Sequence, residues 1–93
     1  MSYSLEFLPK ALKEWDSLNS TIKEQFKKKL QKVLENPKIP NNKLSNLDNV
    51  YKIKLRSSGF RLAYQVKDEE IVVLVVKVGK RDTIYKDLMN RFD

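Results

Sequence analysis

The sequence has no cysteine and no histidine among its 93 residues. Without cysteine, disulfide bonds, thiol nucleophiles and cysteine-based zinc sites are excluded. Without histidine, the chain lacks the side chain that most often transfers protons near neutral pH and that most often binds metals. Enzymes that use a Ser-His-Asp triad or a catalytic thiol are therefore excluded, and any catalysis must use other groups.

Glycine is scarce, because Gly59 and Gly79 are the only two in the chain. A glycine-rich phosphate loop is therefore excluded, and we expect no nucleotide cofactor. The acidic residues 68–70 are adjacent in a predicted turn, where their carboxylates cannot all point at one ion. We interpret them as solvated charges and expect no bound metal.

Long apolar runs are missing as well. No window of the sequence approaches the roughly 18 apolar residues of a membrane span, and the N-terminus lacks the basic and apolar regions of a signal peptide. We therefore expect a cytoplasmic protein with no membrane partner, folded as a single domain over residues 1–93.

Basic residues outnumber acidic ones, with 19 Lys and Arg against 12 Asp and Glu and a formal net charge of +7. This balance favours nucleic acid or another anionic partner. Net charge alone fits a merely basic soluble protein equally well. The placement of the charge therefore matters more than its sum.

Alternation of apolar and basic residues predicts a cationic β-hairpin in the middle of the chain. Strand side chains alternate between the two faces of a sheet, so residues 51–56 present one apolar and one basic face. The basic face consists of Lys52, Lys54 and Arg56. Gly59 supplies the turn, and a second strand at 60–64 adds Arg61 beside the lysines. Such a surface fits a phosphate-rich partner.

The remaining pattern predicts an α+β fold with the order β-α-α-β-β-β-α and an antiparallel sheet packed by helices. The other predicted elements are a strand at 3–7, helices at 10–18 and 20–35, a buried strand at 71–76 and a C-terminal helix at 82–92. The second helix has an apolar stripe that consists of Ile22, Phe26, Leu30, Val33 and Leu34. Thr21 and Glu24 have the spacing of a capping box at the start of the second helix. Asp82 or Thr83 is the predicted cap of the last one.

Cations and tyrosines remain for chemistry, and this set is able to cleave RNA. The ribose 2′-hydroxyl attacks the neighbouring phosphodiester, so no external nucleophile is needed. The reaction requires a base for the hydroxyl, donors for the charge on the phosphoryl oxygens and an acid for the departing 5′-oxygen.

Tyr85 is a candidate for the base. A phenol is a poor base near neutral pH, with an ordinary pKa of about 10, but cations within roughly 4 to 6 Å favour its ionised form. Lys52 and Lys54 are candidates for those cations, and the N-terminus of the predicted C-terminal helix acts in the same direction. The alternative for Tyr85 is a packing role, because Tyr85, Met89 and Phe92 share a helical spacing.

Arg81 lies between a predicted strand and a predicted helix, where its guanidinium is able to reach a phosphate or protonate a leaving oxygen. The alternative is an ordinary surface arginine. For Lys52, Lys54 and Arg61 the alternative is a solvated strand face. Residues 27–29 are three lysines on the polar side of a helix, with phosphate contact as a second possibility.

Four segments resemble the RelE toxins of bacterial toxin-antitoxin pairs, in the same order and at near-identical spacing. They are Ala11 to Trp15, Tyr51 to Gly59, Arg61-Leu62 and Val78 to Arg81. The resemblance spans nearly the whole chain. It implies a small fold with a twisted antiparallel sheet packed by helices, and a ribosome-dependent endonuclease that cuts messenger RNA in the A site.

The resemblance also implies roles for individual residues. The catalytic set that matches the family is Lys52, Lys54, Arg61, Arg81 and Tyr85. In that family the tyrosine is the general base, the arginine after Gly-Lys is the general acid, and the other cations stabilise the transition state. We add Lys27, Lys28, Arg56 and Lys80 as RNA-binding candidates. The stretch from Arg81 to Tyr85 is shorter than in the RelE pattern, and Ser45 stands where a similar RelE sequence has an arginine.

The partners implied by the family are a RelB-type antitoxin, the ribosome with its 16S rRNA and A-site messenger RNA, and operator DNA only as a toxin-antitoxin complex. We expect the antitoxin to cover the cationic surface and to displace the C-terminal helix. One alternative function is a ParE-like toxin that inhibits DNA gyrase without catalysis. Another is a co-repressor that binds DNA with its antitoxin. The basic and tyrosine set favours the nuclease.

Overall fold

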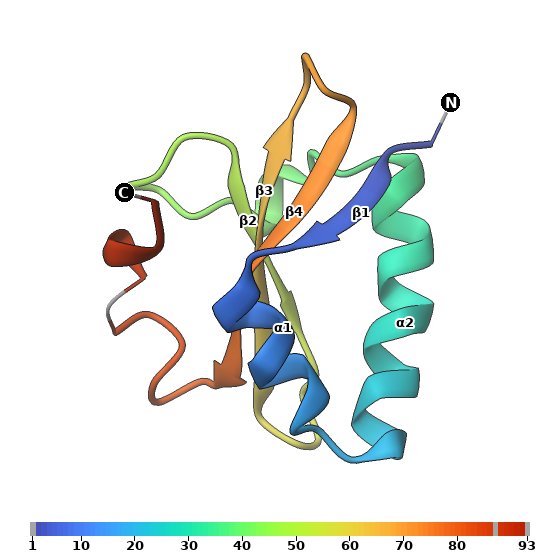
Figure 1. Cartoon of the computed structure of the whole chain (residues 1–93), viewed down its shortest axis with the longest axis vertical. Coiled ribbons are helices and arrows are strands. Elements are labelled where there is room, and N and C mark those ends of the chain that lie inside the picture. The colour runs from blue at the N-terminus through green and yellow to red at the C-terminus, as the bar shows by residue number, and fades with distance from the viewer. Residues whose placement is uncertain (1, 87, 93) are drawn as a thin grey trace.

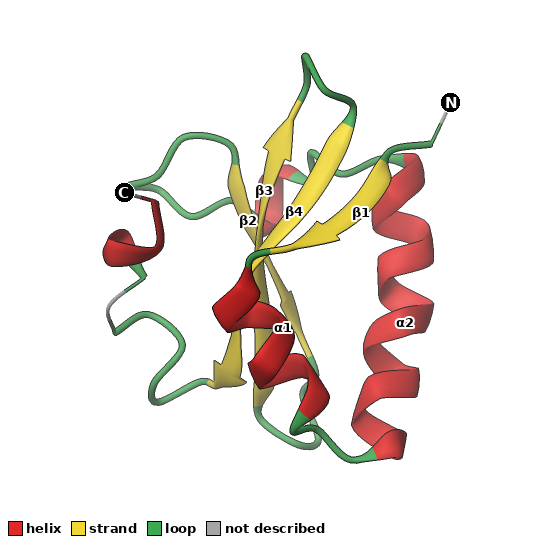
Figure 2. Cartoon of the chain, in the orientation of Figure 1, coloured by secondary structure: helices red, strands yellow, loops and turns green. Residues whose placement is uncertain are grey.

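The computed structural model describes residues 2–86 and 88–92, which form a four-stranded sheet flanked by two main helices (Figures 1 and 2). The main elements are β1 (Ser4–Phe7), α1 (Pro9–Asp16), α2 (Ser20–Glu35), β2 (Val50–Lys54), β3 (Phe60–Lys67) and β4 (Val72–Lys80). Two short 3-10 helices, η1 (Pro40–Asn42) and η2 (Met89–Phe92), complete the described part. No helix within it is long and apolar enough to cross a bilayer.

The strand order is β1-β4-β3-β2, so β4 lies inside the sheet, as its apolar sequence predicts. The pairs β2–β3 and β3–β4 are antiparallel, as expected. The β1–β4 pair is parallel, however, and the sheet is mixed rather than antiparallel throughout. Parallel neighbours need a long crossover between them, and the two helices that follow β1 begin the path that leads back to β4.

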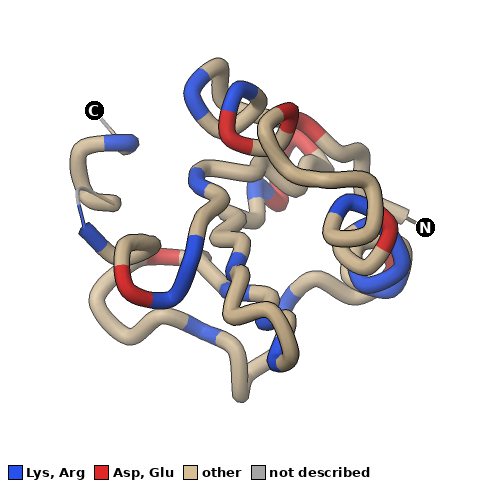
Figure 3. Tube along the Cα trace, turned by 90° about the horizontal axis from the view of Figure 1, so that it is seen from below, with Lys and Arg blue, Asp and Glu red and all other residues tan. Residues whose placement is uncertain are grey.

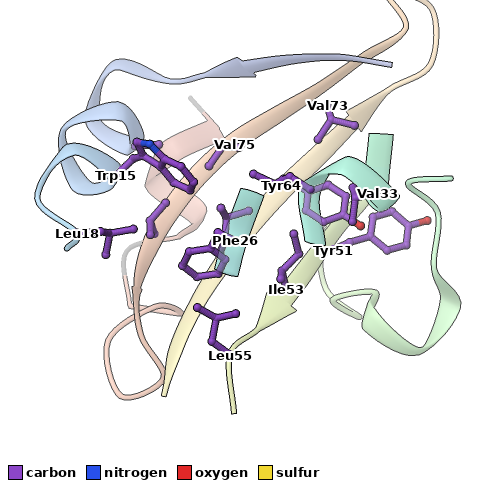
Figure 4. Close-up of a cluster of buried hydrophobic side chains, with 14 of the residues drawn as sticks. Trp15, Leu18, Phe26, Val33, Tyr51, Ile53, Leu55, Tyr64, Val73 and Val75 are labelled. Atoms are coloured by element: carbon purple, nitrogen blue, oxygen red, sulfur yellow. The ribbon is translucent and has the colours of Figure 1, made fainter. Parts of the chain in front are cut away.

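The main core lies between α2 and one face of the sheet (Figure 4). The predicted stripe of α2 is confirmed at its buried positions, which are Ile22, Phe26, Leu30 and Val33. Trp15 of α1 extends this core, with its ring centroid 6.0 Å from that of Phe26. Phe26 has no exposed surface, and truncating such a residue to alanine typically costs about 3–5 kcal/mol.

The opposite face of the sheet is only partly covered. A smaller buried cluster there consists of Ala63, Val76 and Leu88, with partly buried leucines around it. The segment that supplies Leu88 lies on the other side of the sheet from α2 (Figure 1). This unequal cover leaves the basic side of the hairpin accessible, as the predicted alternation requires: Lys54 is exposed, whereas Ile53 and Leu55 are buried.

The cap of α2 differs from the prediction. The N-cap is Asn19, whose side chain accepts a hydrogen bond of 2.9 Å from the amide of Ile22. The capping box predicted at Thr21 and Glu24 is therefore wrong. Asparagine is among the best N-cap residues, and it caps the helix two residues before Thr21. Glu24 instead forms an exposed ion pair with Lys27.

The C-terminal helix predicted at 82–92 is also wrong, since residues 81–86 form turns and only η2 is helical. In a continuous α-helix the carbonyl of Lys86 would accept a hydrogen bond from the amide four residues later. Here it accepts one from the ammonium of Lys77 on β4. Tyr85 therefore does not lie in the first turn of a helix, and the helix-dipole argument for it does not apply. The predicted helix also included Asp87, which lies outside the described residues.

A polar cluster stabilises the end of the sheet at the turn between β3 and β4. The carboxylate of Asp68, in the turn between β3 and β4, accepts hydrogen bonds from the Tyr3 hydroxyl at 3.0 Å and from the Lys38 ammonium. The hydrogen bond from Lys38, followed by that from Tyr3, holds the pKa of the Asp68 carboxyl below its ordinary value of 3.8. Asp68 is exposed, as its interpretation as a solvated charge requires, and it is also paired with Lys38 and Tyr3.

Replacing Asp68 with asparagine tests this cluster through its pH dependence. A carboxylate whose pKa is lowered in the folded state stabilises that state above its ordinary pKa, and loses the effect as the pH falls through the folded value. We expect Asp68→Asn to lower the melting temperature at neutral pH, and the difference from the parent protein to shrink at acid pH, below the ordinary pKa of the carboxyl. Glu70→Gln in the same turn is the control. A loss of equal size at both pH values would contradict the ionic origin.

Candidate functional site

The pairing of β2 with β3 gathers three basic side chains into a cationic face, defined as Lys52, Lys54 and Arg61. Lys54 pairs directly with Arg61, and Lys52 with Ala63. Residues directly opposite in an antiparallel pair lie on the same face, with Cβ atoms about 4.5–5.5 Å apart. The sequence has no acidic residue between Asp48 and Asp68, and basic positions are spread along the hairpin (Figure 3). The structure therefore brings these predicted residues together.

Mutual repulsion is the main electrostatic property of the cationic face. The charges of Lys52 and then of Arg61 lower the pKa of the Lys54 ammonium below its ordinary value, and desolvation adds to this. Like charges directly opposite each other destabilise a sheet. The folded protein holds them together without a carboxylate on the same strands, so an anionic ligand would relieve the repulsion.

Tyr85 lies beside this face, and the residue is 42% exposed. A guanidinium nitrogen of Arg61, Nη1, donates a hydrogen bond of 3.1 Å to the Tyr85 hydroxyl oxygen. The neighbouring Ile84 is the buried residue in this turn, which argues against a packing role for Tyr85. The prediction placed Lys52 and Lys54 next to the phenol, whereas the contact that the structure shows is with Arg61.

Arg81 follows β4 at the hairpin end of the sheet. Its amide donates a hydrogen bond of 2.9 Å to the carbonyl of Gly59, whose φ of +76° makes the turn. Two residues earlier, Gly79 pairs with Arg61. Arg81 is exposed, and the hydrogen bond of its amide keeps its backbone near the cationic face.

Three of the four RNA-binding candidates lie away from this face. Lys80 pairs with Phe60 and lies over its ring, 5.6 Å from the centroid, on the side of the sheet that α2 covers. Lys27 lies beside the groove that α2 forms with β1, at the opposite edge of the sheet from β2. Lys28 is exposed on α2. Of the four candidates, only Arg56 lies close enough to the cationic face for its charge to act on Lys54.

A second basic feature was not predicted. A cavity of about 360 Å³ lies between α2 and the β2 edge, and we call it the basic groove. Its charged residues are Lys29, Lys32, Lys54 and Arg56. The ammonium of Lys29 donates a hydrogen bond of 3.0 Å to the Lys54 carbonyl, which ties helix to strand. No acidic residue lines the groove. Lys29 lies four residues before Val33 on the helix, and Lys32 lies one residue before it. Their positions beside the buried stripe could therefore have been read from the sequence.

The residues of the site are suited to bind and polarise a phosphate. Guanidinium and ammonium groups donate hydrogen bonds to phosphoryl oxygens, and an exposed phenol is able to take or give a proton. Within 2–86 and 88–92, no group of three or more carboxylates could hold a metal ion. The donors available to a phosphate at this site are therefore those of the basic side chains.

Comparison with known proteins identifies the family. The sequence matches the ParE toxin of the type II toxin-antitoxin system parDE over residues 5–85. It is 55% identical over 93 residues to the mRNA interferase toxin RelE of Escherichia coli, with 98% of each chain covered. The chain belongs to the RelE family of toxins. The resemblance found in the sequence is thereby confirmed.

Solved structures of RelE have the same fold. The isolated E. coli RelE toxin superposes with a TM-score of 0.84 at 53% identity, covering 99% of this chain and 100% of that one. A chain of the intact E. coli RelBE toxin-antitoxin complex gives a TM-score of 0.84 at 59% identity, covering 85% and 96% respectively. The small α+β fold predicted for a RelE-family toxin is therefore confirmed.

The repulsion within the cationic face predicts that removing one charge stabilises the protein. We expect Lys54→Gln to raise the melting temperature at low ionic strength, because its ammonium repels Lys52 and Arg61. The gain should shrink in about 1 M salt, where the screening length falls to about 3 Å. Lys28→Gln, on the exposed side of α2, is the control. An unchanged or lower melting temperature for Lys54→Gln at low salt would contradict the claim.

Proposed function

We propose that this protein is the toxin of a type II toxin-antitoxin pair, and that it cleaves messenger RNA in the ribosomal A site and so inhibits translation. The observation that carries the proposal is the contact between Arg61 and Tyr85 beside Lys54 on the partly covered face of the sheet. The name of the E. coli relative, mRNA interferase toxin RelE, supports the same activity.

The proposed reaction uses only side chains of the site. Tyr85, as the general base, removes the proton of the ribose 2′-hydroxyl, and the oxygen attacks the adjacent phosphorus. Arg81, as the general acid, protonates the 5′-oxygen as its bond to phosphorus breaks. The products are a 2′,3′-cyclic phosphate and a free 5′-hydroxyl. Proton transfer by positioned groups typically contributes about 10²–10⁴-fold.

The three residues of the cationic face stabilise the transition state in this mechanism. Negative charge grows on the phosphoryl oxygens as the 2′-oxygen attacks, and fixed cations favour that charge more than they favour the starting phosphodiester. Arg61 has two functions here, since the guanidinium that faces the phosphate also donates to Tyr85. No metal or cofactor takes part in these steps.

The ribosome is the proposed source of substrate positioning. The chain has no histidine, and its cationic face is open rather than enclosed, so it has few groups to hold RNA in line. Orienting the reacting atoms typically contributes about 7–11 kcal/mol of the barrier reduction. A requirement for ribosomes also places the protein in the cytoplasm.

The proposed protein partner is a RelB-type antitoxin. Relatives support this, because E. coli RelE is found in a RelBE toxin-antitoxin complex. An antitoxin segment with acidic residues would neutralise the cationic face, where repulsion already lowers the pKa of Lys54. Binding of operator DNA is proposed only for the toxin-antitoxin complex.

A ParE-like inhibitor of DNA gyrase is the second candidate function, because the family match carries the ParE name. Such a toxin needs no general base or acid. The assembled set of Lys54, Arg61 and Tyr85 and the 55% identity to an mRNA interferase favour the nuclease. Inhibition of gyrase supercoiling without RNA cleavage would decide for the ParE activity.

Replacing Arg81 with alanine tests the proposed reaction. We expect Arg81→Ala to lower the rate of messenger RNA cleavage on ribosomes by about 10²–10³-fold, as removal of one transition-state donor typically does. Ribosome binding should change little. Single-turnover cleavage and a ribosome pelleting assay give the two numbers, with Lys13→Ala on α1 as the control. Equal loss of binding and cleavage would make Arg81 a docking residue.

The basic groove is the proposed path of the RNA backbone beyond the cationic face, because Lys54 belongs to both. We expect Lys32→Gln to weaken ribosome binding and to reduce the slope of log affinity against log salt by about 1, as loss of one phosphate contact does. Lys28→Gln, outside the groove, should have a smaller effect. Equal effects of the two variants would argue against the groove.

A further inference from the structure

Past the end of the pairing between β1 and β4, side chains instead of a strand form hydrogen bonds with the backbone of β4. Pairing with β1 ends at Val75, whose carbonyl accepts a hydrogen bond of 3.0 Å from the Leu8 amide. Next along β4, the carbonyl of Val76 accepts one of 2.9 Å from Arg91 Nη1. The amide of Val78 donates one of 3.1 Å to Glu14 Oε1. Buried backbone groups need hydrogen-bond partners, and here the side chains of Glu14 and Arg91 supply them in place of a strand.

Glu14 and Arg91 also bind each other through two parallel hydrogen bonds. Arg91 Nη1 lies 3.0 Å from Glu14 Oε1, and Nη2 lies 2.9 Å from Oε2. Their side chains are only 14% and 29% exposed, Arg91 first. Bidentate arginine-carboxylate pairs of this kind fix both position and orientation. The pair therefore fastens η2 to α1 and β4 in one defined place.

A third residue fixes the chain next to Tyr85. Lys77 of β4 is 8% exposed, and its ammonium donates a hydrogen bond to the carbonyl of Lys86. On the other side of Tyr85, Ile84 is buried. The tyrosine thus lies between two residues held in place, with its own side chain projecting to Arg61.

Apolar packing alone does not account for the position of this segment. A cavity of about 640 Å³ lies under it, lined by Lys10, Glu14, Lys77, Thr83, Lys86 and Arg91 among others. Most of these side chains are charged. A segment above such an open polar cavity depends on specific hydrogen bonds for its position, because water is able to replace weaker contacts.

We propose that Glu14, Lys77 and Arg91, which we call the C-terminal anchor, are positioning residues for Tyr85. They hold residues 81–86 and 88–92 against β4, so that the phenol oxygen faces Arg61 at the cationic face. None of the three needs to touch RNA for this. The inference rests on the function proposed above for Tyr85, but the position of the side chain is measurable without it.

The kinetic test uses Glu14→Gln, which keeps an oxygen for the Val78 amide and removes the charge that holds Arg91. We expect kcat for ribosome-dependent cleavage to fall by about 10–100-fold, as small misplacements of a catalytic group do, with KM nearly unchanged. Lys77→Met, which breaks the contact with Lys86, should act in the same way. Asp16→Asn, an exposed carboxylate on the same helix, is the matched control.

Combination with Tyr85→Phe separates positioning from general destabilisation. If the anchor acts through Tyr85, Glu14→Gln should cost nothing further once the phenol is gone. A merely structural role would lower cleavage by the same factor in both backgrounds, and that result would overturn the proposal.

Fluorine NMR of protein labelled with 3-fluorotyrosine gives a readout that does not need catalysis. The Tyr85 signal is assigned by its absence in Tyr85→Phe. We expect it to shift or broaden in Glu14→Gln and Lys77→Met, and to stay unchanged in Asp16→Asn. Full cleavage by Tyr85→Phe would refute Tyr85 as the general base. The NMR measurement would still test whether the C-terminal anchor positions the Tyr85 side chain. An unchanged Tyr85 signal in both anchor variants would refute the anchor.

Discussion

The direct pairing of Lys54 with Arg61 across β2 and β3 is the constraint on which the candidate site depends. It places like charges on neighbouring strands, an arrangement that costs stability. The cost is tolerated because the other face of the same strands packs against α2, where Ile53 and Leu62 are buried. One hairpin thus supplies part of the core and a surface that attracts phosphate.

The candidate site combines two parts that differ in local stability, the β2–β3 hairpin and the segment that carries Tyr85. The hairpin is held by strand pairing and by the main core. The segment that carries Tyr85 is held by two buried apolar residues, Ile84 and Leu88, and by the hydrogen bonds of the C-terminal anchor. Segments with few apolar contacts open at lower free energy than the core does. A partner that competes for these contacts would separate the phenol from the cations without unfolding the sheet.

Local patterns in the sequence predicted the parts of the fold that are fixed locally. The alternation at 51–56 gave the two faces of β2, and the spacing from Ile22 to Val33 gave the buried stripe of α2. Prediction failed where distant residues decide. Where a C-terminal helix was predicted, the Lys86 carbonyl accepts a hydrogen bond from Lys77 of β4, and the Glu14–Arg91 pair joins positions 77 residues apart. For the candidate site, the clustering of Lys54 with Arg61 was predicted. Lys29 was considered only as a possible phosphate contact, and Lys32 was not predicted, because the basic groove lies between α2 and β2 and requires both elements to be placed first.

The central claim is that the assembled cations and phenol cleave RNA only when a ribosome presents it. The most direct measurement is primer-extension mapping of a defined messenger RNA incubated with the protein, with and without ribosomes that have an empty A site. The account predicts a cut within the A-site codon that appears only with ribosomes. Equally strong cleavage of naked RNA would contradict the role given to the ribosome, and no cleavage by correctly folded protein under either condition would contradict the nuclease itself.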